Sequence, residues 1–164
     1  MKPCEGCGAP APGGATGCQS MFEELLARDF SDVAYFSVHR LLVDTYALQH
    51  PERYCASPKS LAAHLMGLCW AMEMGGRRSI GSESLRAWLD GPARVQKPEI
   101  PSHRGKLTIA DVRSASDVAA HVRAVDLWAR STWTAYASLH ATARDWIEQA
   151  LGEESGPGRD RQPR

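Results

Sequence analysis

The sequence predicts an all-α protein, a helical bundle of four or five helices that carries a zinc-knuckle-like segment at its N-terminus. Apolar residues recur at three- and four-residue spacings in several stretches, and glycine or proline separates these stretches, as expected for amphipathic helices. The first nineteen residues are instead rich in glycine, proline and alanine, and they hold three of the five cysteines. The length of 164 residues suits one domain with a real core. We expect three parts: a cysteine knuckle segment (1–19), a helical bundle (20–151) and a polar, disordered tail (152–164).

Composition excludes several classes of protein. Nineteen lysines and arginines balance nineteen aspartates and glutamates, and this argues against a dedicated nucleic-acid binder, which must neutralise phosphates. No apolar run reaches the length of a membrane span, and no basic start with an apolar core marks a secretory signal. We therefore expect a cytoplasmic protein with reduced thiols, whose partner is a small-molecule ligand or another protein. Composition leaves the oligomeric state open.

The N-terminal segment carries the pattern Cys4-x2-Cys7-Gly8, followed by Cys18. Two cysteines at this spacing can point both sulfurs at one metal ion, and a glycine after them can take the positive φ that such a turn often needs. The segment has little apolar content, so metal binding would supply the free energy that orders it. The pattern predicts bound Zn²⁺ with Cys4, Cys7 and Cys18 as ligands. A flexible tail with incidental thiols is the alternative.

Structural zinc takes four ligands, so one more must come from further along the chain. His50 is favoured because it lies at a predicted helix end, next to a proline that fixes the chain. Cys55, His39 and His64 are the other candidates.

The helix predicted over 32–51 is the element around which the chain is organised. Asp32 is expected as its N-cap, and Pro51 as its end. His39 and His50 lie eleven residues apart, about 16 Å along the helix axis, so they cannot share one metal ion. Asp44 lies in an apolar part of this helix and is expected to be a buried charge that needs a hydrogen-bond donor.

The ends of the other predicted helices are marked by capping residues and by glycine or proline. Ser20 with Glu23 predicts a capping box and a short helix over 20–29. Ser57 and Pro58 predict the start of a helix over 57–74, which ends at Gly75-Gly76. The remaining predictions are a helix over 82–90, a long connection over 91–108, a helical turn or two over 108–115, and a long helix from a cap at Ser116 to Leu151.

Three histidines, His39, His64 and His121, lie on separate predicted helices and are expected to face one interior. Inward histidines on separate helices are how bundles build cofactor sites. One hypothesis is a pocket with His39, Asp44, His64 and His121, which binds a small ligand or a second metal or performs acid–base chemistry. The competing hypothesis is a non-enzymatic interaction module with a purely structural zinc, in which these histidines form hydrogen bonds within the core. The sequence names no reaction.

A resemblance covers nearly the whole chain except the tail. The knuckle with Cys18, the run from His39 through Val43-Asp44, Tyr46 and Gln49-His50-Pro51, then His64-Leu65, resembles a family of small bacterial proteins of uncharacterised function. The later residues Gly105-Lys106-Leu107-Thr108, His121, Trp128, Trp133 and His140 are similar to that family as well. The resemblance implies a metal-binding helical domain and brings no activity with it. A weaker likeness is to metal-dependent four-helix thiol transferases, but this chain lacks their H-x3-H pair.

Overall fold

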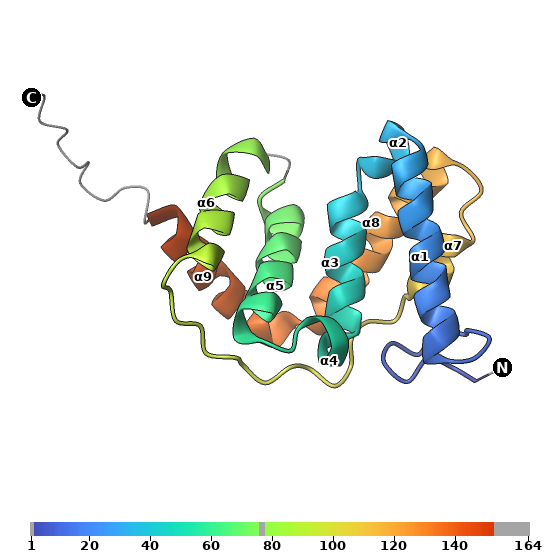
Figure 1. The fold of residues 1–164 in the computed structure, drawn as a ribbon, viewed down its shortest axis with the longest axis horizontal. Coiled ribbons are helices and arrows are strands. Elements are labelled where there is room, and N and C mark those ends of the chain that lie inside the picture. Colours follow the sequence, from blue (N-terminus) through green and yellow to red (C-terminus); the bar gives the residue numbers. More distant parts are fainter. Residues whose placement is uncertain (1, 76–77, 153–164) are drawn as a thin grey trace, which may run out of the picture.

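The computed structural model describes residues 2–75 and 78–152, and the regular secondary structure of this part is helical, apart from one isolated bridge between Pro3 and Pro10 (Figure 1). Six helices have eleven or more residues: α1 (Ala15–Ser31), α3 (His39–Gln49), α5 (Pro58–Glu73), α6 (Arg78–Asp90), α8 (Val118–Ala135) and α9 (His140–Gly152). The short elements are α2 (Val33–Phe36), α4 (Pro51–Tyr54), α7 (Ile109–Arg113) and the 3-10 turn η1 (Ala137–Leu139). None of these described helices is both long and apolar enough to cross a bilayer.

Helix α3 is the centre of the bundle. It packs against α5 and α8 and more lightly against α1, while α9 covers α5 and α6 at the other end of the molecule (Figure 1). The connection from α6 to α7 runs along one side of the molecule and passes α4 (Figure 1). The fold is therefore all-α as predicted, but the described residues form nine α-helices rather than four or five.

The predicted helix over 32–51 is wrong as a single element, because two breaks divide it into α2, α3 and α4. Asp32 is an N-cap as predicted, but of the short α2, and its Oδ1 accepts a hydrogen bond of 2.7 Å from the Ala34 N–H. The Ser37 hydroxyl donates to the Ala34 carbonyl at 2.7 Å, a local bond that competes with helix continuation. At His50 the backbone leaves the helix (φ −128°, ψ 53°), and Pro51 begins α4. The second break leaves His50 at a corner.

Cap predictions were right where the side chain itself makes the cap. Ser57 forms a capping box with Ser60, and Pro58 is the first helical residue. The Ser20 cap is wrong: α1 begins at Ala15, and the Ser20 hydroxyl donates to the Thr16 carbonyl inside the helix. The Gly- and Ala-rich composition before residue 20 concealed this first turn.

The predicted long helix from Ser116 to Leu151 is also wrong in detail. Asp117, not Ser116, caps α8, and the chain breaks at Tyr136 before α9. Tyr136 is fully buried, and its hydroxyl donates to the Leu48 carbonyl, so a tertiary bond fixes the corner. The disordered tail predicted from Gly152 lies outside the described residues, except for Gly152 itself, which ends α9.

The long connection over 91–108 is held by buried polar contacts. The Gln49 amide nitrogen donates to the carbonyls of Arg104 and Leu107 at 3.0 and 2.9 Å, and the Gln49 oxygen accepts from the Trp128 indole at 3.0 Å. Because Gln49 precedes His50, these bonds also fix the end of α3.

Candidate metal centre

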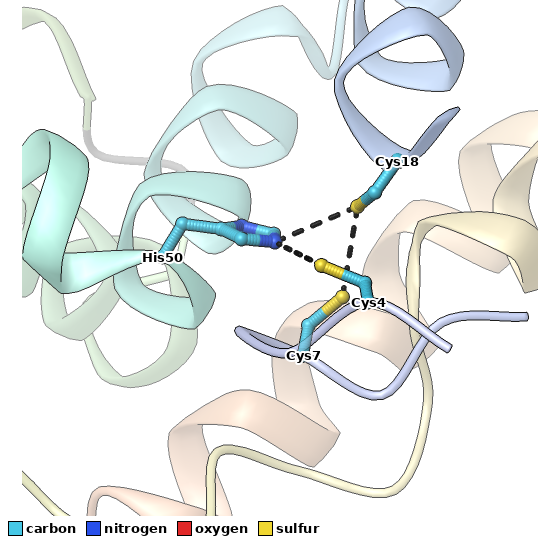
Figure 2. A group of neighbouring side chains, drawn as sticks. All are labelled: Cys4, Cys7, Cys18 and His50. Carbon is cyan, nitrogen blue, oxygen red and sulfur yellow. Dashed lines mark hydrogen bonds between the residues drawn. The ribbon is translucent and has the colours of Figure 1, made fainter. Parts of the chain in front are cut away.

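Three cysteines and one histidine meet where the N-terminal segment, the start of α1 and the end of α3 come together (Figure 2). One ligand atom from each of Cys4, Cys7, Cys18 and His50 lies within 4.8 Å of all the others. The Nε2 atom of His50 is 3.6 Å from the Cys4 sulfur and 3.5 Å from the Cys18 sulfur, and the sulfurs of Cys7 and Cys18 are 3.7 Å apart. These four are the residues that the sequence analysis favoured as a ligand set.

Three of the six separations match the edges of a zinc tetrahedron, and the other three are within 4.8 Å. With Zn–S bonds of about 2.3 Å and a Zn–N bond of about 2.0 Å, tetrahedral geometry requires S···S edges of ~3.8 Å and S···N edges of ~3.5 Å. The three separations given above are 3.7, 3.6 and 3.5 Å, so each lies close to its required edge. Thiolate and imidazole ligands in this arrangement are typical of zinc.

The turn that presents Cys4 and Cys7 depends on backbone bonds and on two glycines. The Gly8 N–H donates to the Cys4 carbonyl and the Cys4 N–H to the Ala9 carbonyl, at 2.8 and 2.9 Å. Gly8 has a φ of 77°, which favours glycine. At Gly6 a Cβ would lie 2.7 Å from the His50 Cδ2 atom, so the missing side chain lets the imidazole approach the turn.

Neighbouring groups fix the orientation of the His50 ring. Its Nδ1 lies 2.8 Å from the Tyr46 carbonyl, and because a carbonyl only accepts, Nδ1 carries the proton and donates it. The unprotonated Nε2 then faces the cysteines, as a metal-binding imidazole requires. Tyr46 also lies beside the ring, with centroids 4.1 Å apart, and stacks on Phe22 of α1.

The surroundings of the cysteine thiols shift their pKa values in different directions. A hydrogen bond from Cys7 lowers the pKa of the Cys18 thiol to about 4, and the same contact raises the pKa of Cys7. Cys55, one of the alternative fourth ligands, is fully buried elsewhere, where its thiol donates to the Ala47 carbonyl. Burial raises the pKa of Cys55 to about 12. Cys55 therefore has the character of a core thiol.

The pocket candidates form two separate histidine–aspartate contacts. The Nδ1 of His64 lies 2.8 Å from Oδ1 of the buried Asp44, whose other oxygen accepts from the Arg40 guanidinium at 2.8 Å. The Nδ1 of His39 lies 3.0 Å from Oδ2 of Asp29. The structure therefore does not pair His39 with Asp44.

His121 contacts the same aspartate from the other side. Its Nε2 is 3.3 Å from Oδ1 of Asp29, off the line of a hydrogen bond, and both residues are fully buried. Burial lowers the pKa of His121, against the opposing effect of the Asp29 charge. His39 and His64 line one groove, and His121 is not among its lining residues.

Asp29 and Gln49 were not predicted as functional residues from the sequence. Asp29 follows Phe22 and Leu25 at helical spacing on the buried face of α1, and this signal could have identified it as a buried charge. No comparable periodic pattern marks Gln49, because its four partners come from the distant loop and from α8.

A family model matches residues 2–137, and the chain therefore belongs to a family of unknown function, DUF5946. This confirms the expected membership in an uncharacterised family. No curated protein and no solved structure matches the chain. The matched range includes the four cluster residues and the histidines of the groove.

Proposed function

We propose that this protein binds one Zn²⁺ through Cys4, Cys7, Cys18 and His50, and that the ion is a structural clamp for the helical body. The observation that carries the proposal is the cluster of four ligand atoms within 4.8 Å of one another, in which three of the six separations are 3.5–3.7 Å and fit a zinc tetrahedron. Four protein ligands fill the coordination sphere, whereas a catalytic zinc keeps a position for water or substrate.

The clamp joins three parts of the chain. Cys4 and Cys7 lie in the N-terminal segment, Cys18 lies in the first turns of α1, and His50 ends α3. Arg104 also connects the N-terminal segment to the chain that follows His50. Its guanidinium donates to the Gly6 carbonyl at 3.2 Å and pairs with Glu52. Zinc affinity is therefore coupled to the order of residues 2–18.

Zinc stoichiometry in ligand and control variants tests the proposal. Cys7→Ser replaces the ligand thiol that is only partly buried, and Cys55→Ser replaces a buried thiol outside the cluster. Elemental analysis should give one zinc per chain for the wild type and Cys55→Ser, and little or none for Cys7→Ser after dialysis against a weak chelator. A metal-free wild type, or equal zinc in both variants, would contradict the proposal.

The sequence leads to two hypotheses, a zinc-binding protein with a histidine-lined pocket for a ligand and an interaction module in which the zinc is purely structural. Exposed apolar side chains favour the second: Phe30, Val33 and Phe36 at the α1–α2 corner are 70, 86 and 44% exposed. If this corner mediates self-association, sedimentation should give a dimer that Phe30→Ser with Val33→Ser abolishes. A wild type that remains monomeric at high concentration would remove this second candidate.

A further inference from the structure

The sulfurs of Cys7 and Cys18 lie against each other at one edge of the metal centre, 3.7 Å apart (Figure 2). The described contact of the Cys4 sulfur is instead with Nε2 of His50, at 3.6 Å. Two cysteine sulfurs in van der Waals contact need only a small movement of one chain segment to form a disulfide. Cys7 and Cys18 are therefore the pair of the cluster that is best placed for this bond.

The three thiols of the cluster differ in their access to solvent. Cys4 and Cys18 are 3 and 0% exposed, whereas Cys7 is only partly buried. Oxidation of a cysteine follows its exposure and its thiolate character, and a cysteine that binds a metal is a thiolate. A small oxidant in solution therefore reaches the sulfur of Cys7 first, with Cys18 directly behind it.

The surroundings of the two residues show which one can move. Cys18 lies in the first turns of α1, where its N–H donates to the Gly14 carbonyl at 3.0 Å and its sulfur is 3.7 Å from the Tyr46 hydroxyl. Cys7 lies before the helix, in the turn that Gly8 closes. Movement of this turn toward α1 is therefore the easier way to join the two sulfurs.

We propose that Cys7 is a site of reversible oxidation by hydrogen peroxide, and that the Cys7–Cys18 disulfide that follows releases the zinc; this rests on the zinc site proposed above. The Cys7 thiolate attacks the peroxide, so that an S–O bond forms, the O–O bond breaks and hydroxide leaves. The Cys18 thiolate then attacks the Cys7 sulfenic acid, so that an S–S bond forms, the S–O bond breaks and a second hydroxide leaves. Each hydroxide takes one proton from solvent. The two sulfurs lose two electrons in total, and the peroxide is reduced to two molecules of water.

The disulfide leaves Cys4 and His50 as the remaining ligands of the cluster. Structural zinc takes four protein ligands, so two do not hold the ion. Its loss opens the clamp between the N-terminal segment and the end of α3. Reduction of the disulfide restores both thiolates, and the change is therefore reversible when zinc is present.

Peptide mapping of the full-length, zinc-loaded wild type after treatment with a stoichiometric amount of hydrogen peroxide tests the proposal. Cleavage after glutamate separates Cys4, in the peptide that ends at Glu5, from Cys7 and Cys18, which share the peptide 6–23. After alkylation of free thiols, we expect peptide 6–23 to be unalkylated and lighter by two hydrogen atoms, and Cys4 to be alkylated. One zinc ion should be released for each disulfide formed, and tris(2-carboxyethyl)phosphine with added Zn²⁺ should restore it. Dimedone present during oxidation should label Cys7 in preference to Cys18.

The variant Cys55→Ser with Cys69→Ser is the matched control, because it removes two fully buried thiols outside the cluster. It should release zinc as the wild type does, and loss of the release would place the reactive thiol outside the cluster. Zinc content before oxidation separates the two proposals, since a metal-free wild type contradicts the zinc site itself. A wild type that binds zinc but keeps it after peroxide treatment, or forms a disulfide that includes Cys4, overturns the redox proposal alone.

Discussion

At the scale of single residues, the metal centre depends on the glycine at position 6, which leaves room for the His50 ring. Gly6 lies against the His50 ring. The hydrogen bond from His50 to the Tyr46 carbonyl and the contact with the Tyr46 ring hold this imidazole in place. In Gly6→Ala the new Cβ would lie 2.7 Å from the His50 Cδ2 atom, so the imidazole or the turn must move. We predict at least a tenfold loss of zinc affinity, about 1.4 kcal/mol, in competition with a chromophoric chelator.

Glu5→Ala is the control for this prediction. Glu5 lies in the same turn, and its side chain is exposed and paired only with the exposed Lys2 in the described structure. A surface pair of this kind contributes little, so zinc affinity should remain at the wild-type value. Equal zinc affinities for Gly6→Ala and Glu5→Ala would show that the close approach of Gly6 to His50 has no role.

At the scale of elements, a buried carboxylate connects three helices. Asp29 on α1 lies between His39 on α3 and His121 on α8, and the groups facing His121 are Asp29, the Arg28 guanidinium and the Tyr35 ring. Burial lowers the pKa of His121 below its unfolded value of about 6.5. Between the two pKa values the unfolded state binds more protons, so this residue makes the folded state less stable as the pH falls.

We therefore predict that the free energy of unfolding decreases from pH 7.5 to 5.5, and that the decrease is smaller in His121→Leu. Urea unfolding at saturating zinc measures it, with His103→Leu as a control because that side chain is exposed. If the free energy of unfolding falls equally in the wild type and in His121→Leu over this range, His121 is not the source of the pH dependence.

Element prediction succeeded where the signal is local. Ser57-Pro58 marks the start of α5 because cap and first turn are adjacent in the sequence. The breaks at Ser37 and Tyr136 carry no glycine or proline, so no breaker residue identified them. Tyr136 ends α8 through a bond to the Leu48 carbonyl, a contact 88 residues away.

At the scale of the whole molecule, the all-α class and the grouping of the cysteines with His50 follow from the sequence. Structural zinc takes four ligands, so three local cysteines predict that a fourth ligand comes from elsewhere in the chain. The pairing of the histidines was not predictable. His39 and His64 each contact an aspartate through tertiary packing, and one of these, Asp29, gave only a weak signal. His121 joins the Asp29 contact rather than the groove.

The central claim is that one zinc ion joins the N-terminal segment to α1 and α3. X-ray absorption at the zinc edge of the full-length protein tests it most directly, because it reports ligand type and bond length together. We predict three sulfur ligands at about 2.3 Å and one nitrogen ligand at about 2.0 Å, with the nitrogen contribution lost in His50→Cys. A shell dominated by nitrogen and oxygen, or a spectrum that is the same in His50→Cys, would contradict the claim.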